Sequence, residues 1–137
     1  MTTLSSLPGN PICAPDNPAH LMWVKPMNRR VTISRNGRVL ARTTRALRVT
    51  EMARDLYPPM IYVPREDVSA GLIGNSKTTH CPLKGDARYF DLGSTGQDGG
   101  EVPNIAWAYD DALDSAAVLV GHVAFDPGQV DLTDSPA

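Results

Sequence analysis

The stretch that decides the fold is Val31-Thr-Ile-Ser-Arg-Asn36-Gly37-Arg-Val-Leu40. On both sides of Asn36-Gly37 apolar residues are interleaved with polar ones, which is typical of short strands with one buried face. Asn-Gly supplies the two positive φ angles of a type I′ turn, so the stretch predicts a two-residue β-hairpin. The predicted register pairs Val31 with Arg42, Ile33 with Leu40, and Ser34 with Val39.

Short apolar segments continue after this hairpin, and Pro, Gly, Asn or Asp bounds each of the inner ones. The predicted strands are Ala46–Thr50, Met60–Val63, Ala87–Leu92, Ile105–Tyr109 and a buried Val118–Phe125. The other predicted elements are a helical turn at Arg65–Val68, a short helix at Asp111–Ala117, a glycine-rich connection at 93–103 and a short edge strand within 126–137. Strands of this length and spacing predict a mainly antiparallel β domain.

The length of 137 residues is that of a single domain with one core. Five prolines interrupt residues 1–28, which we interpret as a tail with one helical turn at Pro18–Trp23. The predicted organisation is therefore an N-terminal tail (1–28), one β domain (29–132) and a C-terminal tail (133–137).

Composition indicates a globular protein in water: 42% of the residues are hydrophobic and 20% are charged. No apolar run approaches the ~18 residues that a membrane-spanning helix needs, and the first residues do not resemble a secretory leader. We therefore expect no membrane partner and a cytoplasmic location.

The chain has two cysteines, Cys13 and Cys81, and three histidines. Two thiols cannot form a four-cysteine zinc site, and Cys13 lies in the predicted tail, so neither a metal nor a disulfide framework is expected. The phosphate-binding strings Gly-x-x-x-x-Gly-Lys-Ser/Thr and Gly-x-Gly-x-x-Gly are missing, so no nucleotide cofactor is expected either.

Charge is distributed unevenly along the chain, although the net charge is only -2. Residues 25–65 carry ten basic side chains against two acidic ones, and residues 66–137 carry three against twelve. One interpretation is that the two halves neutralise each other across the fold. The other is that a basic face remains and attracts an anionic ligand or nucleic acid.

Candidate chemistry concentrates in the segment Thr78–Phe90. Adjacent residues of a strand point to opposite faces, so His80 and Cys81 are not expected to form a catalytic pair. Cys81 precedes Pro82, a setting in which we interpret it as a small buried residue. Lys84-Gly85 is the stronger candidate, because the lysine supplies a positive charge and the glycine lets backbone approach an anion closely. The alternative is that Lys84 only pairs with Glu51 or Asp86.

Five motifs resemble those of one protein family. In chain order they are Arg45-Ala-Leu-Arg-Val-Thr-Glu51, Pro59-Met-Ile-Tyr62-Val-Pro64-Arg-Glu-Asp67-Val, Thr79-His80-Cys81-Pro82-Leu-Lys84-Gly85-Asp-Ala87-Arg-Tyr89, Asn104-Ile-Ala106-Trp107-Ala-Tyr109 and Gly121-His-Val123-Ala124-Phe125. They resemble the bacterial and fungal family called domain of unknown function 427, some of whose members carry a nucleotidyltransferase label. Leu83 and Asp126 stand where that family often has aromatic residues, so a less aromatic pocket rim is expected here.

The resemblance implies a β-tent fold: two small antiparallel sheets that meet at a steep angle, with one or two short helices and no metal cysteines. Together with the polar residues in otherwise apolar segments, it predicts one shared cleft that binds a small anionic molecule. The predicted ligand-binding residues are Arg45, Glu51, Tyr62, His80, Lys84, Tyr89 and Trp107.

Two alternatives stay open at this stage. The first is an enzyme that uses the same cleft, with Glu51 or His80 as general base and Lys84 as stabiliser of an oxyanion or phosphate. The second is a module that binds a protein or nucleic acid through its basic half. Nucleic acid is disfavoured, because the acidic half cancels much of that field and aromatic residues for base stacking are few.

Overall fold

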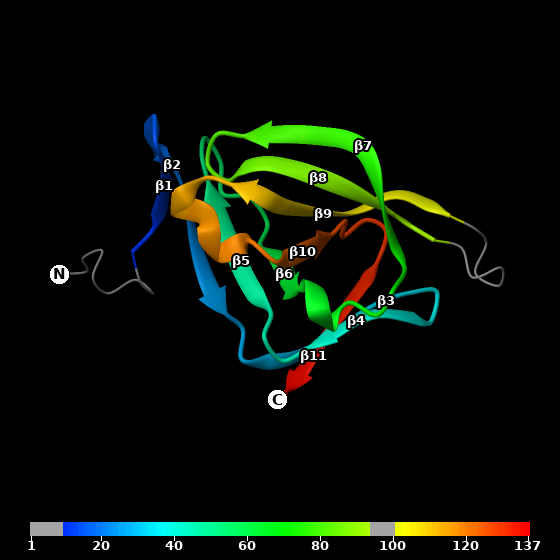
Figure 1. Ribbon diagram of the computed structural model, residues 1–137. Coiled ribbons are helices and arrows are strands. Elements are labelled where there is room, and N and C mark those ends of the chain that lie inside the picture. Colours follow the sequence, from blue (N-terminus) through cyan, green and yellow to red (C-terminus); the bar gives the residue numbers. More distant parts are fainter. Residues whose placement is uncertain (1–9, 94–100) are drawn as a thin grey trace.

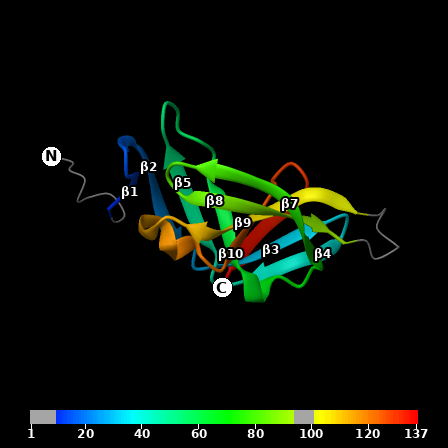
Figure 2. The same cartoon turned by 45° about the horizontal axis from the view of Figure 1, so that its top comes forward.

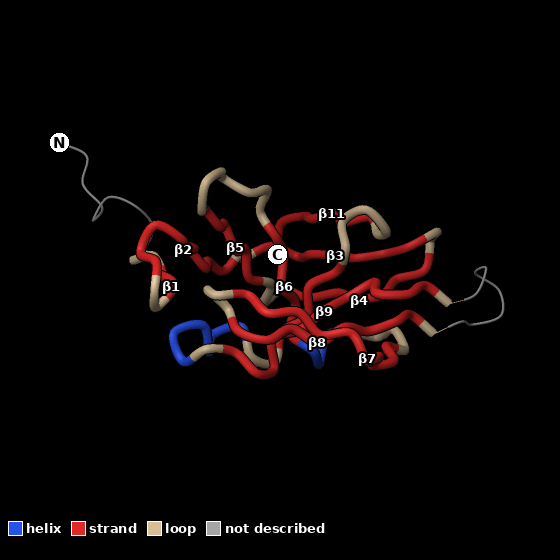
Figure 3. Tube along the Cα trace, turned by 90° about the horizontal axis from the view of Figure 1, so that it is seen from above, coloured by secondary structure: helices blue, strands red, loops and turns tan. Residues whose placement is uncertain are grey.

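The computed structural model describes residues 10–93 and 101–137 (Figure 1). The strands of this part are β1 (Ile12–Ala14), β2 (Asn17–Pro26), β3 (Arg29–Arg35), β4 (Arg38–Thr43), β5 (Leu47–Met52), β6 (Met60–Pro64), β7 (Leu72–Cys81), β8 (Gly85–Leu92), β9 (Val102–Ala112), β10 (His122–Phe125) and β11 (Asp131–Pro136). Helix in the described ranges is confined to two short 3-10 turns, η2 (Arg65–Asp67) and η3 (Asp114–Leu119), as Figure 3 shows. The prediction of a mainly β fold is confirmed.

The described strands form two antiparallel sheets. The larger has eight strands in the order β1-β2-β5-β6-β10-β9-β8-β7, and the smaller has three in the order β11-β3-β4. Figure 1 shows β7, β8 and β9 along the top and the three-stranded sheet below them at the right. None of the helices in the described part is long and apolar enough to cross a membrane.

The β3–β4 hairpin confirms the turn prediction and corrects part of the register. Asn36 and Gly37 both have positive φ, at 50° and 81°, and Ser34 pairs with Val39 as predicted. Ile33 pairs with Ala41 instead of Leu40, and Val31 with Thr43 instead of Arg42, because a bulge inserts Leu40 as an extra residue. The carbonyl of Leu40 accepts hydrogen bonds from the amides of Ser69 and Ala70, and its side chain is fully buried. The bulge thus joins the hairpin to the loop before β7.

The prediction of a tail over residues 1–28 is wrong for residues 12–26, since β1 and β2 are strands of the larger sheet. Leu21 to Pro26 pair with Met52 to Leu47 of β5, so the predicted turn at Pro18–Trp23 is strand, and Cys13 belongs to β1. The prolines do not prevent this pairing, because Pro18 precedes the paired residues and Pro26 ends them.

Two further boundaries differ from the predictions. The short helix begins at Asp114, not Asp111, because β9 continues to Ala112 and pairs there with Gly85. The final buried strand begins only at His122, after Gly121 turns the chain with a φ of 81°. At the C-terminus β11 is the predicted edge strand, but it runs into the predicted tail as far as Pro136. The helical turn at Arg65–Asp67 is as predicted, whereas most of the glycine-rich connection lies outside the described residues.

Buried apolar residues form two clusters on opposite faces of the larger sheet. Residues that are adjacent along a strand point to opposite faces and so belong to different clusters. Val63 and Val123 belong to the first cluster, whereas Tyr62 and Ala124 belong to the second. The first cluster includes Val31, Ile33 and Leu40 of the smaller sheet. The second lies against η3, which Figures 1 and 2 both place beside β1.

Candidate functional site

A pocket of about 250 Å³ opens on the face of the larger sheet that carries the second cluster. Its walls come from β5, β6, β8, β9, the loop before β6 and the turn between β7 and β8. The lining residues are Val49, Glu51, Tyr57, Pro58, Met60, Tyr62, Lys84, Tyr89, Trp107 and Tyr109. Five of the seven predicted site residues are therefore brought together: Glu51, Tyr62, Lys84, Tyr89 and Trp107.

Lys84 is the central polar group of this pocket. It is only 6% exposed, and its ammonium forms an ion pair with Oε1 of Glu51, one of the two pairings considered from the sequence. The other carboxylate oxygen of Glu51 lies 2.7 Å from Nε2 of His20 on β2. Burial raises the pKa of Glu51, but the hydrogen bonds from Lys84 and His20 outweigh it and hold that pKa below its ordinary value. Glu51 is thus a fixed anion between two basic side chains.

The turn between β7 and β8 explains why Lys84 points inward. Leu83 is fully buried in the second cluster, and the Lys84 carbonyl accepts a 2.9 Å hydrogen bond from the Leu113 amide. Gly85 has a φ of 114°, and a Cβ there would lie 2.6 Å from the carbonyl oxygen of Asp111. The glycine was predicted to admit a ligand, but in the structure it admits the backbone of β9.

Aromatic side chains make up most of the remaining wall. The rings of Tyr62 and Tyr109 lie 6.5 Å apart, and those of Tyr89 and Trp107 lie 6.1 Å apart. Nζ of Lys84 lies 5.8 Å from the centroid of the Tyr109 ring. Burial raises the pKa of both Tyr62 and Tyr109, so both phenols stay protonated at neutral pH and act as neutral hydrogen-bonding groups.

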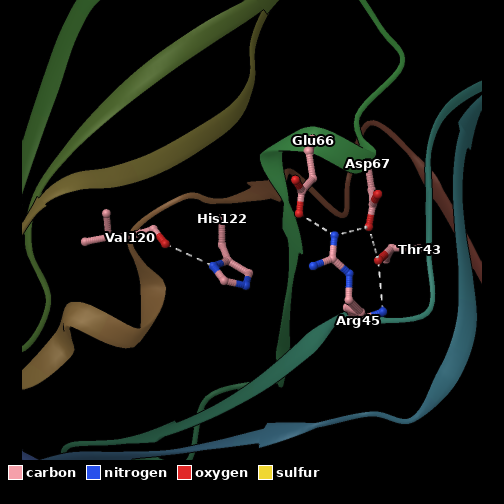
Figure 4. Close-up of polar contacts among 6 residues, drawn as sticks. All are labelled: Thr43, Arg45, Glu66, Asp67, Val120 and His122. Carbon is pink, nitrogen blue, oxygen red and sulfur yellow. Dashed lines mark hydrogen bonds and ion pairs between the residues drawn. The ribbon is translucent and has the colours of Figure 1, made fainter.

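Arg45 does not line the pocket. It precedes β5, and its guanidinium pairs with Glu66 and Asp67 of η2, while its amide donates to Thr43 (Figure 4). Asp67 also accepts a 2.6 Å hydrogen bond from the hydroxyl of Thr43. This cluster ties the β4–β5 connection to η2 and holds Arg45 away from the pocket.

His80 also lies outside the pocket, because strand alternation places it on the outer face of β7. Its side chain is 65% exposed and its Nδ1 lies 2.7 Å from Asp86, the residue opposite it on β8. Cys81 points the other way and packs against the second cluster, as the alternation predicted. The expected effect of Leu83 and Asp126 on the rim is absent, since neither residue lines the pocket.

Three residues with polar side chains at the site were not among the predicted ligand-binding residues: His20, Tyr57 and Tyr109. His20 was assigned to the tail, although Leu21 to Val24 form a continuous apolar run that could have indicated a strand. His20, Glu51 and Cys81 place one ligand atom each within 4.8 Å of one another. Zinc accepts such ligands, but both oxygens of Glu51 already have partners. The absence of stoichiometric metal stays a prediction, which elemental analysis of the purified protein tests.

Comparison with known proteins identifies the family of the chain. Residues 23–135 match the family described as Domain of unknown function (DUF427), and no curated protein matches. The match begins inside β2 and includes every residue that lines the pocket. Because it spans most of the chain, and as the motifs from Arg45 to Phe125 indicated, the chain belongs to the family Domain of unknown function (DUF427).

Proposed function

We propose that this chain binds a small anionic molecule in the pocket, with Lys84 as the contact for the negative charge. The observation that carries the proposal is that the ammonium of Lys84 is buried at the pocket wall with one carboxylate as its hydrogen-bond acceptor. A lysine ammonium has three donors. Two N–H donors of Lys84 are therefore available to a ligand. A hydrogen bond from this charged donor to an acceptor on the ligand is stronger than one between neutral groups.

The pocket suits a compact ligand with a flat apolar part. Its volume of about 250 Å³ lies just below the ~300–1,000 Å³ of sites for drug-sized molecules. Trp107, Tyr89 and Tyr109 provide ring faces and edges against which one aromatic ring can pack. A single-ring carboxylate such as benzoate has this size and chemistry.

Glu51 limits the affinity of such a ligand. Its carboxylate lies beside Lys84 and repels a second anion. Removing the charge of Glu51 should therefore strengthen anion binding. This expectation distinguishes the proposal from the enzyme alternative.

The enzyme alternative has weaker support. The sequence offered Glu51 or His80 as the general base, and His80 lies outside the pocket, so Glu51 remains. A general base works best when its pKa is near the working pH, whereas the pKa of Glu51 is held below its ordinary value. An interaction module also has less support, because the pairs Arg29–Asp134 and Arg45–Glu66 neutralise part of the basic half.

A fluorescence titration tests the proposal, because the chain has two tryptophans and Trp107 lies in the pocket. In Trp23→Phe protein, benzoate and inorganic phosphate are titrated while Trp107 emission is recorded. We expect a saturable change with at least one of them, and tighter binding after Glu51→Gln.

The double variant Glu51→Gln/Lys84→Met is the matched control. It removes both partners of the buried pair, which costs far less stability than removing one. We expect it to fold and to lose the response to anions. An unchanged response in this variant, or weaker binding after Glu51→Gln, contradicts the proposal.

A further inference from the structure

A second, larger cavity lies on the opposite face of β2, β5 and β6. This groove has a volume of about 830 Å³. Its lining residues are Trp23, Lys25, Pro26, Met27, Arg29, Arg48, Thr50, Pro59, Ile61, Leu132 and Asp134. Strand alternation separates it from the pocket: Arg48 and Thr50 face the groove, whereas Val49 and Glu51 face the pocket.

Apolar residues line much of the groove. They include Met27, Pro59 and Ile61, together with Leu132 of β11, which has 43% of its surface exposed. An uncovered apolar surface of this kind gains free energy when an apolar body displaces water from it. The groove is therefore suited to a ligand with a hydrophobic part.

Two basic residues lie side by side on this face of the sheet and line the groove. Lys25 of β2 is directly opposite Arg48 of β5, and both are exposed. Like charges directly opposite each other destabilise a pair of strands. Arg29 is neutralised by Asp134, but neither Lys25 nor Arg48 forms an ion pair among the described residues. An anion between them would remove their repulsion.

Trp23 provides an independent observation next to these cations. Its indole Nε1 is buried and is the one such side-chain atom in the described ranges without a hydrogen-bond partner. An indole nitrogen can only donate, so it requires an acceptor. Buried donors without acceptors are rare in folded proteins and call for an explanation, such as a bound group.

We infer that the groove is a second ligand site, which binds an organic anion with an apolar or aromatic body. The anionic group, a carboxylate, sulfonate or phosphate, lies between Lys25 and Arg48 and offers an oxygen to Nε1 of Trp23. The apolar body packs against Ile61 and Leu132. This site goes beyond the proposed function. It shares strands with the pocket, but none of its lining residues also lines the pocket.

The test uses 8-anilinonaphthalene-1-sulfonate as the probe and Trp107→Phe protein, in which Trp23 is the remaining tryptophan. We expect the probe to quench Trp23 emission in a saturable way, with one site per chain. Lys25→Gln/Arg48→Gln should weaken binding about tenfold. Arg42→Gln is the matched control, because Arg42 is exposed and lines neither cavity, and it should leave binding unchanged.

Competition identifies the anionic group. Displacement of the probe by 1-naphthoate or 1-naphthyl phosphate supports the inference, and the stronger competitor shows which group the site prefers. Equal displacement by the neutral 1-naphthalenemethanol overturns it, as does unaltered binding to the Lys25→Gln/Arg48→Gln variant. Failure here leaves the pocket proposal intact, because that proposal is read from Trp107 in Trp23→Phe protein.

Discussion

The two faces of β2, β5 and β6 use positive charge in opposite ways. On the pocket face Lys84 is 6% exposed and paired with Glu51, which in turn contacts His20. On the groove face Lys25 and Arg48 are exposed and lie opposite each other without an ion pair among the described residues. A buried, paired cation therefore stabilises the fold and offers only its remaining donors to a ligand, whereas an exposed, unpaired cation is wholly available for binding. Substitutions on the two faces should therefore have different effects.

The largest loss of stability is expected from Gly85→Ala, which disturbs the close approach of the β7–β8 turn to β9 beside the pocket. A Cβ at this position meets three backbone atoms of β9 and the residue after it within 2.9 Å, and the φ of 114° is strained for alanine. We expect a loss of about 3–5 kcal/mol in the free energy of unfolding, measured in urea. Gly37→Ala is the control, because it shares the positive φ but has open space around its Cβ. Equal losses in the two variants would show that the close approach to β9 is unimportant.

The next effect concerns the buried ion pair. Lys84→Met leaves the carboxylate of Glu51 with His20 as its remaining partner, and we expect a loss of about 3 kcal/mol in the free energy of unfolding. Lys77→Met, on the exposed part of β7, should lose less than about 1 kcal/mol. A loss below 1 kcal/mol for Lys84→Met would mean that the pair does not support the fold, and the comparison of the two faces would fail.

Lowering the pH should reduce the free energy of unfolding, because Glu51 becomes protonated and its interactions on the pocket face are lost. The pKa of Glu51 is lower in the folded chain than the ordinary value of 4.5, so folding favours its ionised form. Its stabilisation is complete above that value and is lost as the pH falls through the folded pKa. Glu51→Gln should therefore cost about 2 kcal/mol at pH 7, and the difference from wild type should shrink toward pH 3. Urea unfolding at several pH values measures this, and a difference independent of pH would contradict it.

The smallest effect is expected on the groove face. Lys25→Gln/Arg48→Gln removes two like charges that oppose each other, so the free energy of unfolding should stay within about 0.5 kcal/mol of wild type or rise slightly. The same urea experiment measures it at low salt, where the repulsion is least screened. A loss above about 1 kcal/mol would show that these cations are bound into the fold as Lys84 is.

Local patterns predicted the strands well, because they depend on neighbouring residues. Asn36-Gly37 specified its turn from two residues alone, and strand alternation correctly separated the side chains of His80 and Cys81. The bulge at Leu40 was not predictable in this way, since it depends on hydrogen bonds to Ser69 and Ala70 from a distant loop. The pairing of β2 with β5 was hidden for the same reason: prolines at its ends resembled those of a tail.

The site was predicted in part, for physical reasons that differ from residue to residue. Glu51 and Lys84 are 33 positions apart, and the family motifs that contain them predicted that both belong to the ligand-binding site. Arg45 and His80 belong to the same motifs, but acidic neighbours at Glu66 and Asp86 hold them outside the pocket. Composition could not separate these cases, because it shows which charges exist and not which of them pair.

The most direct test of the pocket is a crystal structure of the protein soaked with 4-bromobenzoate, whose bromine is located by anomalous scattering. We expect bromine density between the rings of Trp107, Tyr89 and Tyr109, with the carboxylate within hydrogen-bond distance of Nζ of Lys84. Density in the groove alone, or a pocket without the ligand at a concentration that saturates the Trp107 response, would contradict it.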